Sequence, residues 1–327
     1  MSKPNTRQQT PFFWKQAHDI DGALQAGAEQ GALFKAGGVD VMDRLNERID
    51  QPLTVINLRN VSGLNFVSAT NGFTSIGPLV TLDRLAADER LPPALRQAAA
   101  LVGTREVRAQ ATLGGSLAQR TRCWYFRSER FQCLRKGGQT CDALEGQHEA
   151  HAIFDNERCA AVHPSSIATA LVALGASVKL RSLGQERTLP LEKFFVSPRQ
   201  DVTRENVLMQ GELIVEVLVP SCATSGYSKL TQPGSFDWPL AEAAVALQLD
   251  NGFVREVSIV LGAAAPTPHR ALASEQVLRG ERLDGRIGRA AQLALEGATP
   301  LPRNRAKLAQ LESVVRRALQ AAAGTGS

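Results

Sequence analysis

The sequence lacks the features that mark membrane, exported and nucleic-acid-binding proteins. No apolar run in its 327 residues approaches the length that spans a bilayer, which predicts no membrane insertion. The opening MSKPNTRQQTPFFWK has neither an apolar signal core nor a twin arginine, so a cytoplasmic location is the default, and the periplasm requires co-export with a partner subunit. The net charge of +5 is spread along the chain, which argues against nucleic-acid binding.

Cysteine is scarce, but it is concentrated in one segment. Four of the five cysteines and three of the five histidines fall within residues 119–164. The four are Cys123, Cys133, Cys141 and Cys159, spaced C-x9-C-x7-C-x17-C. The odd count and missing export signal argue against disulfides, and charged neighbours such as Arg122 and Arg135 argue against simple burial. Four soft thiolates predict a metal site. Structural zinc sites usually have paired C-x2-4-C ligands, which are absent here, so an iron–sulfur cluster is favoured and zinc remains the alternative.

Two adjacent glycine pairs predict anion-binding loops. The first, Gly37-Gly38, follows a predicted short strand at 32–35 and precedes helical spacing from residue 41. Such a turn lets backbone N–H groups converge on a phosphate, although a plain tight turn is the alternative. The second pair, Gly114-Gly115, is flanked by hydroxyl side chains. Neither matches the G-x-G-x-x-G or Walker pattern, but two such loops favour one extended ligand held at both ends.

The length suits two domains with separate cores. An alternating strand at 211–220 ends in proline, and the boundary is expected near Ser221–Ser225. Beyond it the pattern predicts strands, a hairpin turn at Asp250-Asn251-Gly252 and then helices. We therefore predict an α+β protein with domains at 1–222 and 223–327, the first interrupted by a metal-binding insertion at 119–163.

Four motifs in order carry a family resemblance. Lys35–Met42 looks like a flavin loop usually read AGGTD, and Thr112–Leu117 looks like a second loop, usually ATxGGN. Gly211–Pro220 resembles a GELI…P strand, and Tyr227-x-Lys229 resembles a Y-x-K motif that opens a C-terminal domain. Over nearly its whole length the chain thus resembles the FAD-binding middle subunit of the xanthine dehydrogenase family of molybdenum hydroxylases.

The resemblance implies a fold and partners. It implies a two-lobed FAD-binding domain of the vanillyl-alcohol-oxidase (PCMH) type, followed by a smaller α+β domain of the CO dehydrogenase flavoprotein type. It also implies a heterotrimer with a large molybdenum-cofactor subunit and a small [2Fe–2S] subunit. The chain would then pass electrons from iron–sulfur centres through FAD to an external acceptor. No catalytic acid or base is expected in this chain, because substrate chemistry would belong to the large subunit.

The resemblance also implies which residues hold the cofactors. The FAD-binding set would be Lys35, Ala36, Gly37, Gly38, Val39, Asp40, Val41, Met42, Thr112, Gly114, Gly115, Ser116, Ser165, Ser166, Ile214 and Lys229. The four glycines would hold the pyrophosphate, Thr112 and Ser165 would add hydroxyl contacts, Ile214 would pack on the flavin, and Lys229 would bond or charge it. The cysteine segment is similar to the [4Fe–4S] insertion of the flavin subunits of bacterial periplasmic-type aldehyde oxidoreductases, which implies that Cys123, Cys133, Cys141 and Cys159 are ligands and Cys222 is not.

Several positions depart from the family pattern. Val39 stands where Thr is usual, Gln110 and Ser116 stand where Asn is common, and Ser166 replaces an Asp. Each change removes or shortens a polar contact of about 0.5–1.5 kcal/mol. A flavin-free scaffold subunit with a structural zinc or cluster at the cysteines is therefore the alternative function, and a stand-alone flavin oxidase is a third.

Overall fold

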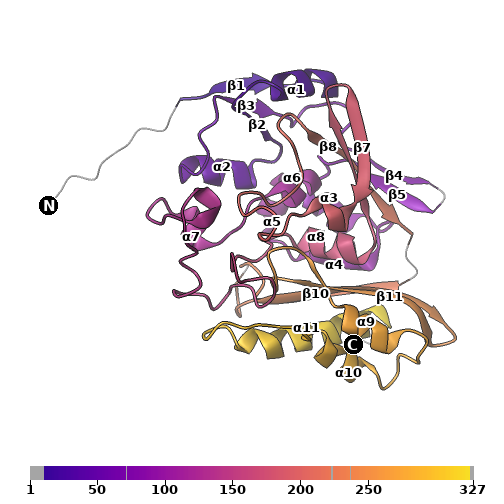
Figure 1. Cartoon of the computed structure of the whole chain (residues 1–327). Helices are drawn as coiled ribbons and strands as arrows, with labels where there is room; N and C mark the ends of the chain where they lie inside the picture. The colour runs from indigo at the N-terminus through magenta and orange to yellow at the C-terminus, as the bar shows by residue number, and fades with distance from the viewer. Residues whose placement is uncertain (1–10, 71, 222–223, 236, 325–327) are drawn as a thin grey trace.

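The computed structural model describes residues 11–70, 72–221, 224–235 and 237–324. Two lobes and a C-terminal domain are arranged one below the other in Figure 1, with the cysteine-bearing insertion along one side. The predicted domain junction at 222–223, and Cys222 with it, lies outside the described residues.

The N-terminal lobe is built on a parallel sheet. Its strands are β1 (Phe13–Gln16), β3 (Thr54–Asn57) and β2 (Ala32–Lys35), in the order β1-β3-β2. Helix α1 (Ile20–Gly27) begins at Asp19, whose carboxylate accepts a hydrogen bond from the Gly22 amide at 2.7 Å. Helix α2 (Val39–Asn46) follows β2 and provides the crossover that parallel pairing requires.

The second lobe contains a five-stranded antiparallel sheet. Its order is β4 (Val67–Thr70), β5 (Phe73–Ile76), β8 (Leu213–Pro220), β6 (Ser177–Ser182) and β7 (Gln185–Pro190). The helical segments of this lobe are α3 (Leu82–Ala87), α4 (Pro93–Ala100), α5 (Arg105–Gln110), α6 (Leu113–Ala118), α8 (Ser166–Ala173) and η2 (Leu191–Phe194). All eight residues of α8 are buried, because the helix lies between this lobe and the next domain.

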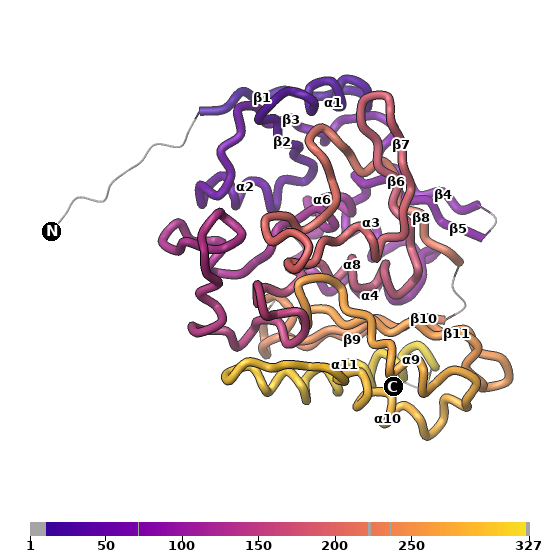
Figure 2. Tube along the Cα trace, in the orientation of Figure 1, coloured from indigo at the N-terminus to yellow at the C-terminus, as the bar shows by residue number. Residues whose placement is uncertain are grey.

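The C-terminal domain is a four-stranded antiparallel sheet between two layers of helices. The strands are β12 (His269–Arg270), β11 (Phe253–Gly262), β10 (Ala241–Asp250) and β9 (Thr224–Leu230), in that order. The domain's own helices are α9 (Leu272–Leu278), α10 (Ile287–Leu293) and α11 (Ala306–Ala322). They cover the face opposite α4 and α8 of the first domain (Figure 2). The predicted hairpin is confirmed, with Asn251 and Gly252 both at positive φ.

The insertion has little regular structure, since it contains only α7 (Trp124–Arg127) and a 3-10 turn, η1 (Leu134–Lys136). Polar side chains of the C-terminal domain hold it instead. Asn304 donates to the carbonyl oxygens of His151 and Ala152 at 3.1 and 3.2 Å, and Lys307 donates to that of Ala150 at 3.3 Å. The insertion therefore depends on the second domain for its shape.

A buried carboxylate joins the two domains. Glu242 on β10 is fully buried and accepts hydrogen bonds from Ser166 at 2.6 Å and Thr169 at 3.0 Å, both on α8. The Tyr227 hydroxyl on β9 donates to the same carboxylate. A buried charge with three donors is costly to separate from them, so this contact fixes how the domains dock.

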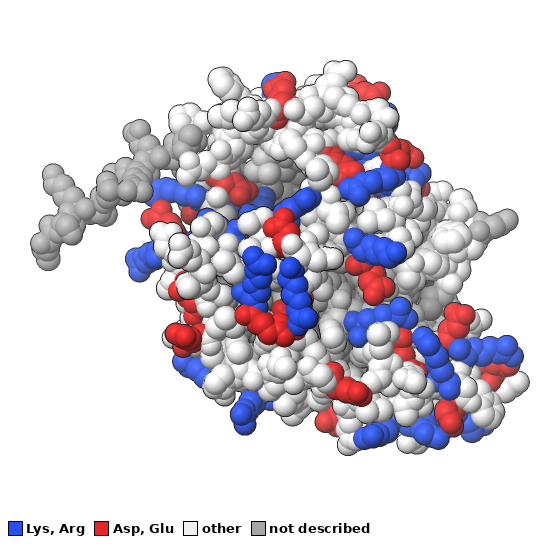
Figure 3. All heavy atoms as spheres, in the orientation of Figure 1, with Lys and Arg blue, Asp and Glu red and all other residues white. Residues whose placement is uncertain are grey.

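Surface charge is mixed on the face shown in Figure 3, where lysine and arginine alternate with aspartate and glutamate. Within the described ranges, no helix is long and apolar enough to cross a membrane.

Lys307 should make stability rise at alkaline pH. Burial lowers its pKa from 10.5 to about 8. Between these pH values the unfolded chain binds more protons than the folded chain, so the unfolding free energy should increase with pH across that window by on the order of 3 kcal/mol. Chemical denaturation at pH 7.5 and 10 should show this rise in the wild type and a smaller rise in Lys307→Met. Equal slopes in the two proteins would contradict the assignment.

Candidate functional site

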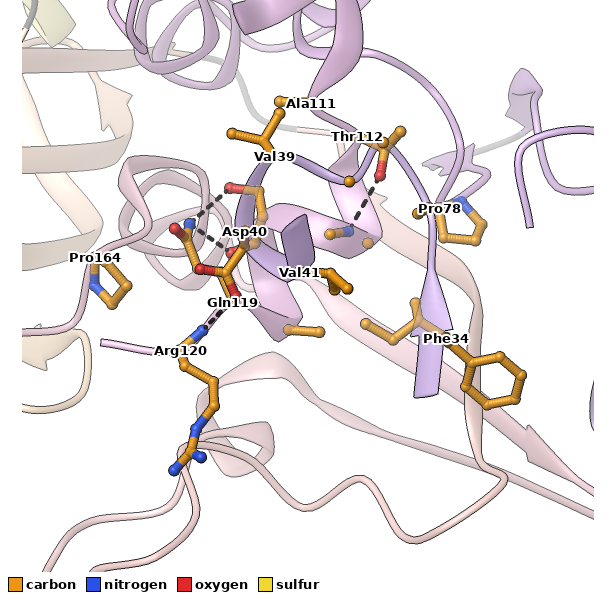
Figure 4. Close-up of a pocket in the computed structure, with 18 of the residues that line it drawn as sticks. Phe34, Val39, Asp40, Val41, Pro78, Ala111, Thr112, Gln119, Arg120 and Pro164 are labelled. Carbon is orange, nitrogen blue, oxygen red and sulfur yellow. Dashed lines mark hydrogen bonds between the residues drawn. The ribbon is translucent and has the colours of Figure 1, made fainter. Parts of the chain in front are cut away.

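A cavity of about 650 Å³ lies where the two lobes, the insertion and the C-terminal domain meet (Figure 4). Thirteen of the sixteen residues predicted to bind FAD line it. They are Ala36, Gly37, Gly38, Val39, Asp40, Val41, Thr112, Gly114, Gly115, Ser116, Ser166, Ile214 and Lys229. Residues almost 200 positions apart in the sequence thus line the same cavity.

The other three predicted residues do not line the cavity. Lys35 donates to Asn57 at 3.2 Å and lies over the Trp14 ring. Met42 is partly exposed on α2. Ser165 is buried, and its hydroxyl accepts from the Ala168 amide as the cap of α8.

The first glycine pair allows a close approach of two loops. A Cβ on Gly37 would lie 1.9 Å from the Gln110 carbonyl oxygen, so a larger residue there would push this loop away from the end of α5. Gly38 adopts a φ of 91°, which is the left-handed region that favours glycine. The predicted strand at 32–35 delivers this turn as expected.

The start of α2 has free hydrogen-bond donors. Gly38 is the N-cap and has no side chain to accept from the first turn of the helix. Val39, Asp40 and Val41, which form that turn, line the cavity. In the described part of the chain, the amides of Gly37 and Gly38 make no backbone hydrogen bond either. An anion in the cavity would meet these N–H groups and the positive end of the helix.

The second glycine pair is different, because its amides are already used within the chain. The Gly114 amide donates to the Pro78 carbonyl at 2.8 Å. The Gly115 amide donates to the Thr112 hydroxyl at 3.2 Å, the contact that caps α6. The two glycines of the second loop therefore leave space in the cavity but offer it no free N–H group. The free N–H donors come from the first loop.

Asp40 connects the first loop to the insertion. Its carboxylate pairs with Arg127 at 2.6 Å and Arg122 at 3.2 Å, and it accepts from the Arg120 amide at 3.2 Å. Arg44 on the next turn of α2 lies 3.3 Å away. Burial alone would raise the pKa of Asp40, but the surrounding guanidinium groups outweigh it and hold the pKa below its ordinary value.

The departures from the family pattern have visible consequences. Val39 places an apolar side chain at the cavity wall. The Ser116 hydroxyl lies 2.9 Å from that of Ser165, and the Ser166 hydroxyl donates to Glu242. Both serines on this wall thus have partners inside the chain.

Other lining residues were not predicted. They include Arg120, residues 203–206 of the loop before β8, and Trp238, whose ring lies 4.8 Å from the Arg122 guanidinium. The charged neighbours of the cysteines were the one sequence signal for the arginines. Lys229, which was predicted, donates to the Leu101 carbonyl at 2.9 Å, and burial lowers its pKa.

The four cysteines lie in one region beside this cavity. Cys159 accepts from Arg135 Nε at 3.1 Å, and the Cys123 sulfur lies 3.2 Å from His151 Nε2. The Cys141 thiol donates to Cys159, which with the nearby Arg135 charge lowers the pKa of Cys159 to about 6 despite burial. Burial, together with the charges of Cys159 and Cys133, raises the pKa of Cys123 to about 12. These thiols are close enough to influence one another.

Among the residues that the structure describes, no three His, Cys, Asp or Glu side chains converge closely enough to hold a single metal ion. A zinc ion requires such convergence, because its sulfur ligands all lie about 2.3 Å from the one metal. A [4Fe–4S] cluster takes one cysteine at each of four separate irons, so its ligands surround a larger volume.

Comparisons with known proteins agree with this architecture. Residues 8–222 match the FAD binding domain in molybdopterin dehydrogenase, and residues 227–322 match the CO dehydrogenase flavoprotein C-terminal domain. The aldehyde oxidoreductase FAD-binding subunit PaoB of Escherichia coli is 34% identical over 79% of this chain and 82% of its own length. The carbon monoxide dehydrogenase medium chain of Hydrogenophaga pseudoflava is 24% identical over 92% of each chain.

Solved structures show the same fold. Quinoline 2-oxidoreductase from Pseudomonas putida 86 superposes with a TM-score of 0.75 at 24% identity, covering 98% of this chain and all of that one. The fold and the cavity define a flavoprotein subunit of an oxidoreductase. The chain belongs to the FAD-binding medium subunits of the molybdenum hydroxylase family, and the predicted family and fold class are confirmed.

Substitution of Gly37 tests the close approach of the two loops. Gly37→Ala should lower the unfolding free energy by about 3 kcal/mol, because the methyl group overlaps a backbone carbonyl that cannot rotate away. Gly288→Ala on α10 is the control: its methyl group meets nothing within 4 Å, and helix propensity should add up to about 1 kcal/mol. Thermal melts should separate the two, and a Gly37→Ala protein as stable as wild type would rule out the contact.

Proposed function

We propose that the chain passes electrons from iron–sulfur centres through FAD to an external acceptor, as the medium subunit of a heterotrimer with a large molybdenum-cofactor subunit and a small [2Fe–2S] subunit. The cavity is the observation that carries this proposal, since both flavin loops, β8 and the C-terminal domain contribute to it. Its volume of about 650 Å³ lies within the range usual for cofactor sites.

The residues present fit FAD. The pyrophosphate would take the free N–H groups of Gly37, Gly38 and the first turn of α2, while the positions of Gly114 and Gly115 leave room for it without donating. Ile214 and Val39 offer apolar contacts, and Lys229 brings a partly buried amino group to the lining. FAD, when bound, accepts electrons singly or in pairs and releases them to an acceptor such as NAD⁺, oxygen, a quinone or ferredoxin.

The four cysteines form the second part of the proposal, as ligands of a [4Fe–4S] cluster. The donor set is four thiols in one region, which is the ligand set of such clusters. Arg135 and His151 each lie within hydrogen-bond distance of a cysteine sulfur and would stabilise the negative charge of the thiolates. Aldehydes are the substrate class that we favour for the complex, because the relative at 34% identity is an aldehyde oxidoreductase subunit.

A spectrum of the anaerobically purified chain tests both parts. We expect flavin absorption bands, a broad shoulder that dithionite bleaches, and about four irons and four acid-labile sulfides per chain. Aldehyde turnover by this chain alone is not expected. A colourless protein with one zinc would contradict the proposal and favour a scaffold subunit, while iron without flavin would contradict the FAD assignment only.

The first flavin loop can be tested by a matched pair of glycine substitutions. Gly38 and Gly184 both adopt positive φ, at 91° and 71°, but Gly184 lies in the β6–β7 turn with nothing near it. Both alanine variants bear a similar backbone strain of about 1–2 kcal/mol. Fluorescence titration should show a Kd for FAD at least tenfold weaker in Gly38→Ala and unchanged in Gly184→Ala. Equal affinities in the two variants would place the pyrophosphate elsewhere.

A further inference from the structure

A continuous line of ion pairs runs from the cysteine site to the wall of the cavity. Arg135 Nε donates to the Cys159 sulfur at 3.1 Å, and its Nη1 donates to Glu205 at 3.3 Å. The other oxygen of Glu205 accepts from Arg120 Nε at 2.8 Å. Arg120 and Glu205 both line the cavity. One carboxylate therefore contacts a residue of each site.

The charges in this line alternate and are poorly solvated. The side chain of Arg135 is 2% exposed and that of Glu205 is 9% exposed. A sulfur that binds a cluster is held in place by its iron, so a bound Cys159 would fix the position of Arg135 and, through it, that of Glu205. Without the cluster the Cys159 sulfur can move, and Arg135 and Glu205 can move with it.

The backbone gives a movement of Arg135 a route to the cavity. Arg120 also donates to the Thr203 carbonyl at 2.9 Å, and its own amide donates to Asp40. Arg135 donates to the Arg204 carbonyl at 3.4 Å. The loop at 203–206 and the first turn of α2 are thus held by the two arginines that share Glu205. A shift of that carboxylate toward Arg135 would loosen the cavity wall at both places.

We propose that Glu205 couples the cysteine site to the FAD cavity, so that occupancy of either site raises the affinity of the other. This inference rests on the proposed function, since it requires both cofactors. Coupling of this kind is reciprocal. Glu205 and Arg135 are positioning residues in it, because neither has to touch the flavin ring.

The test measures FAD affinity with and without the cluster in the full-length chain. Wild-type protein is prepared anaerobically with its iron and, separately, after removal of iron by oxidation and a chelator. Fluorescence titration should give a Kd for FAD about tenfold weaker in the iron-free protein. By reciprocity, saturating FAD should slow the loss of iron to the chelator.

Glu205→Gln should reduce the ratio of the two Kd values to less than about twofold, while iron content stays near that of wild type. Arg135→Lys keeps the positive charge, but one amino group cannot contact Cys159 and Glu205 from two sides as the guanidinium does. It should therefore also reduce the ratio, and it provides the test if Glu205→Gln does not fold. Glu312→Gln is the matched control: Glu312 pairs with Arg316 at 2.9 Å within α11 and does not line the cavity, and its ratio should stay near tenfold.

A wild-type ratio near one, or an undiminished ratio in Glu205→Gln and Arg135→Lys, would overturn the coupling and leave the proposed function intact. A wild-type chain that binds no FAD would overturn the FAD assignment, and one that binds no iron would overturn the cluster assignment; either result would overturn the coupling as well. The two failures are thus distinguished by the wild-type protein alone.

Discussion

The carboxylate of Asp40 holds the cofactor-binding half of the molecule together. It lies in the first turn of α2, directly after the glycine turn, and contacts one arginine of the same helix and two arginines and one amide of the insertion. A carboxylate at a helix N-terminus is favoured by the helix dipole. Here it also draws the insertion onto α2, so the same side chain orients the free N–H groups and closes one side of the cavity.

Glu242 plays the corresponding role at the domain junction. It takes hydrogen bonds from both domains in a site without water access, and Gly262 on the neighbouring strand leaves room for it, since a Cβ there would lie 2.0 Å from its carboxylate. The two carboxylates differ in their partners, because arginines neutralise Asp40 whereas hydroxyl groups solvate Glu242. Asp40 lines the cavity itself, and Ser166, which donates to Glu242, lines it too.

The sequence predicted the parts of the site that have a local pattern. Gly37-Gly38 after a strand, Gly114-Gly115 after hydroxyls and four clustered cysteines are visible without a structure. Which amides remain free is not local: Gly114 is used by Pro78, 36 residues earlier, and this pairing appears only when the chain is folded. The role of Glu205 could not be predicted for the same reason, because nothing near it in the sequence indicates that two arginines contact it in the folded chain. Short helices such as α5 and α6 also escaped, because six residues show too little periodicity.

The order β4-β5-β8-β6-β7 has a consequence for biosynthesis. Strand β8 is central in this sheet but last in sequence, so the hairpins β4-β5 and β6-β7 have no common neighbour until residues 213–220 are made. Pairing across such a separation is slow, because loop closure precedes any gain in contacts. The cysteine segment, which comes before β8, therefore leaves the ribosome before this sheet closes and before the C-terminal residues that hold it are made. The cavity, which Ile214 of β8 lines, is complete only after this sheet has closed.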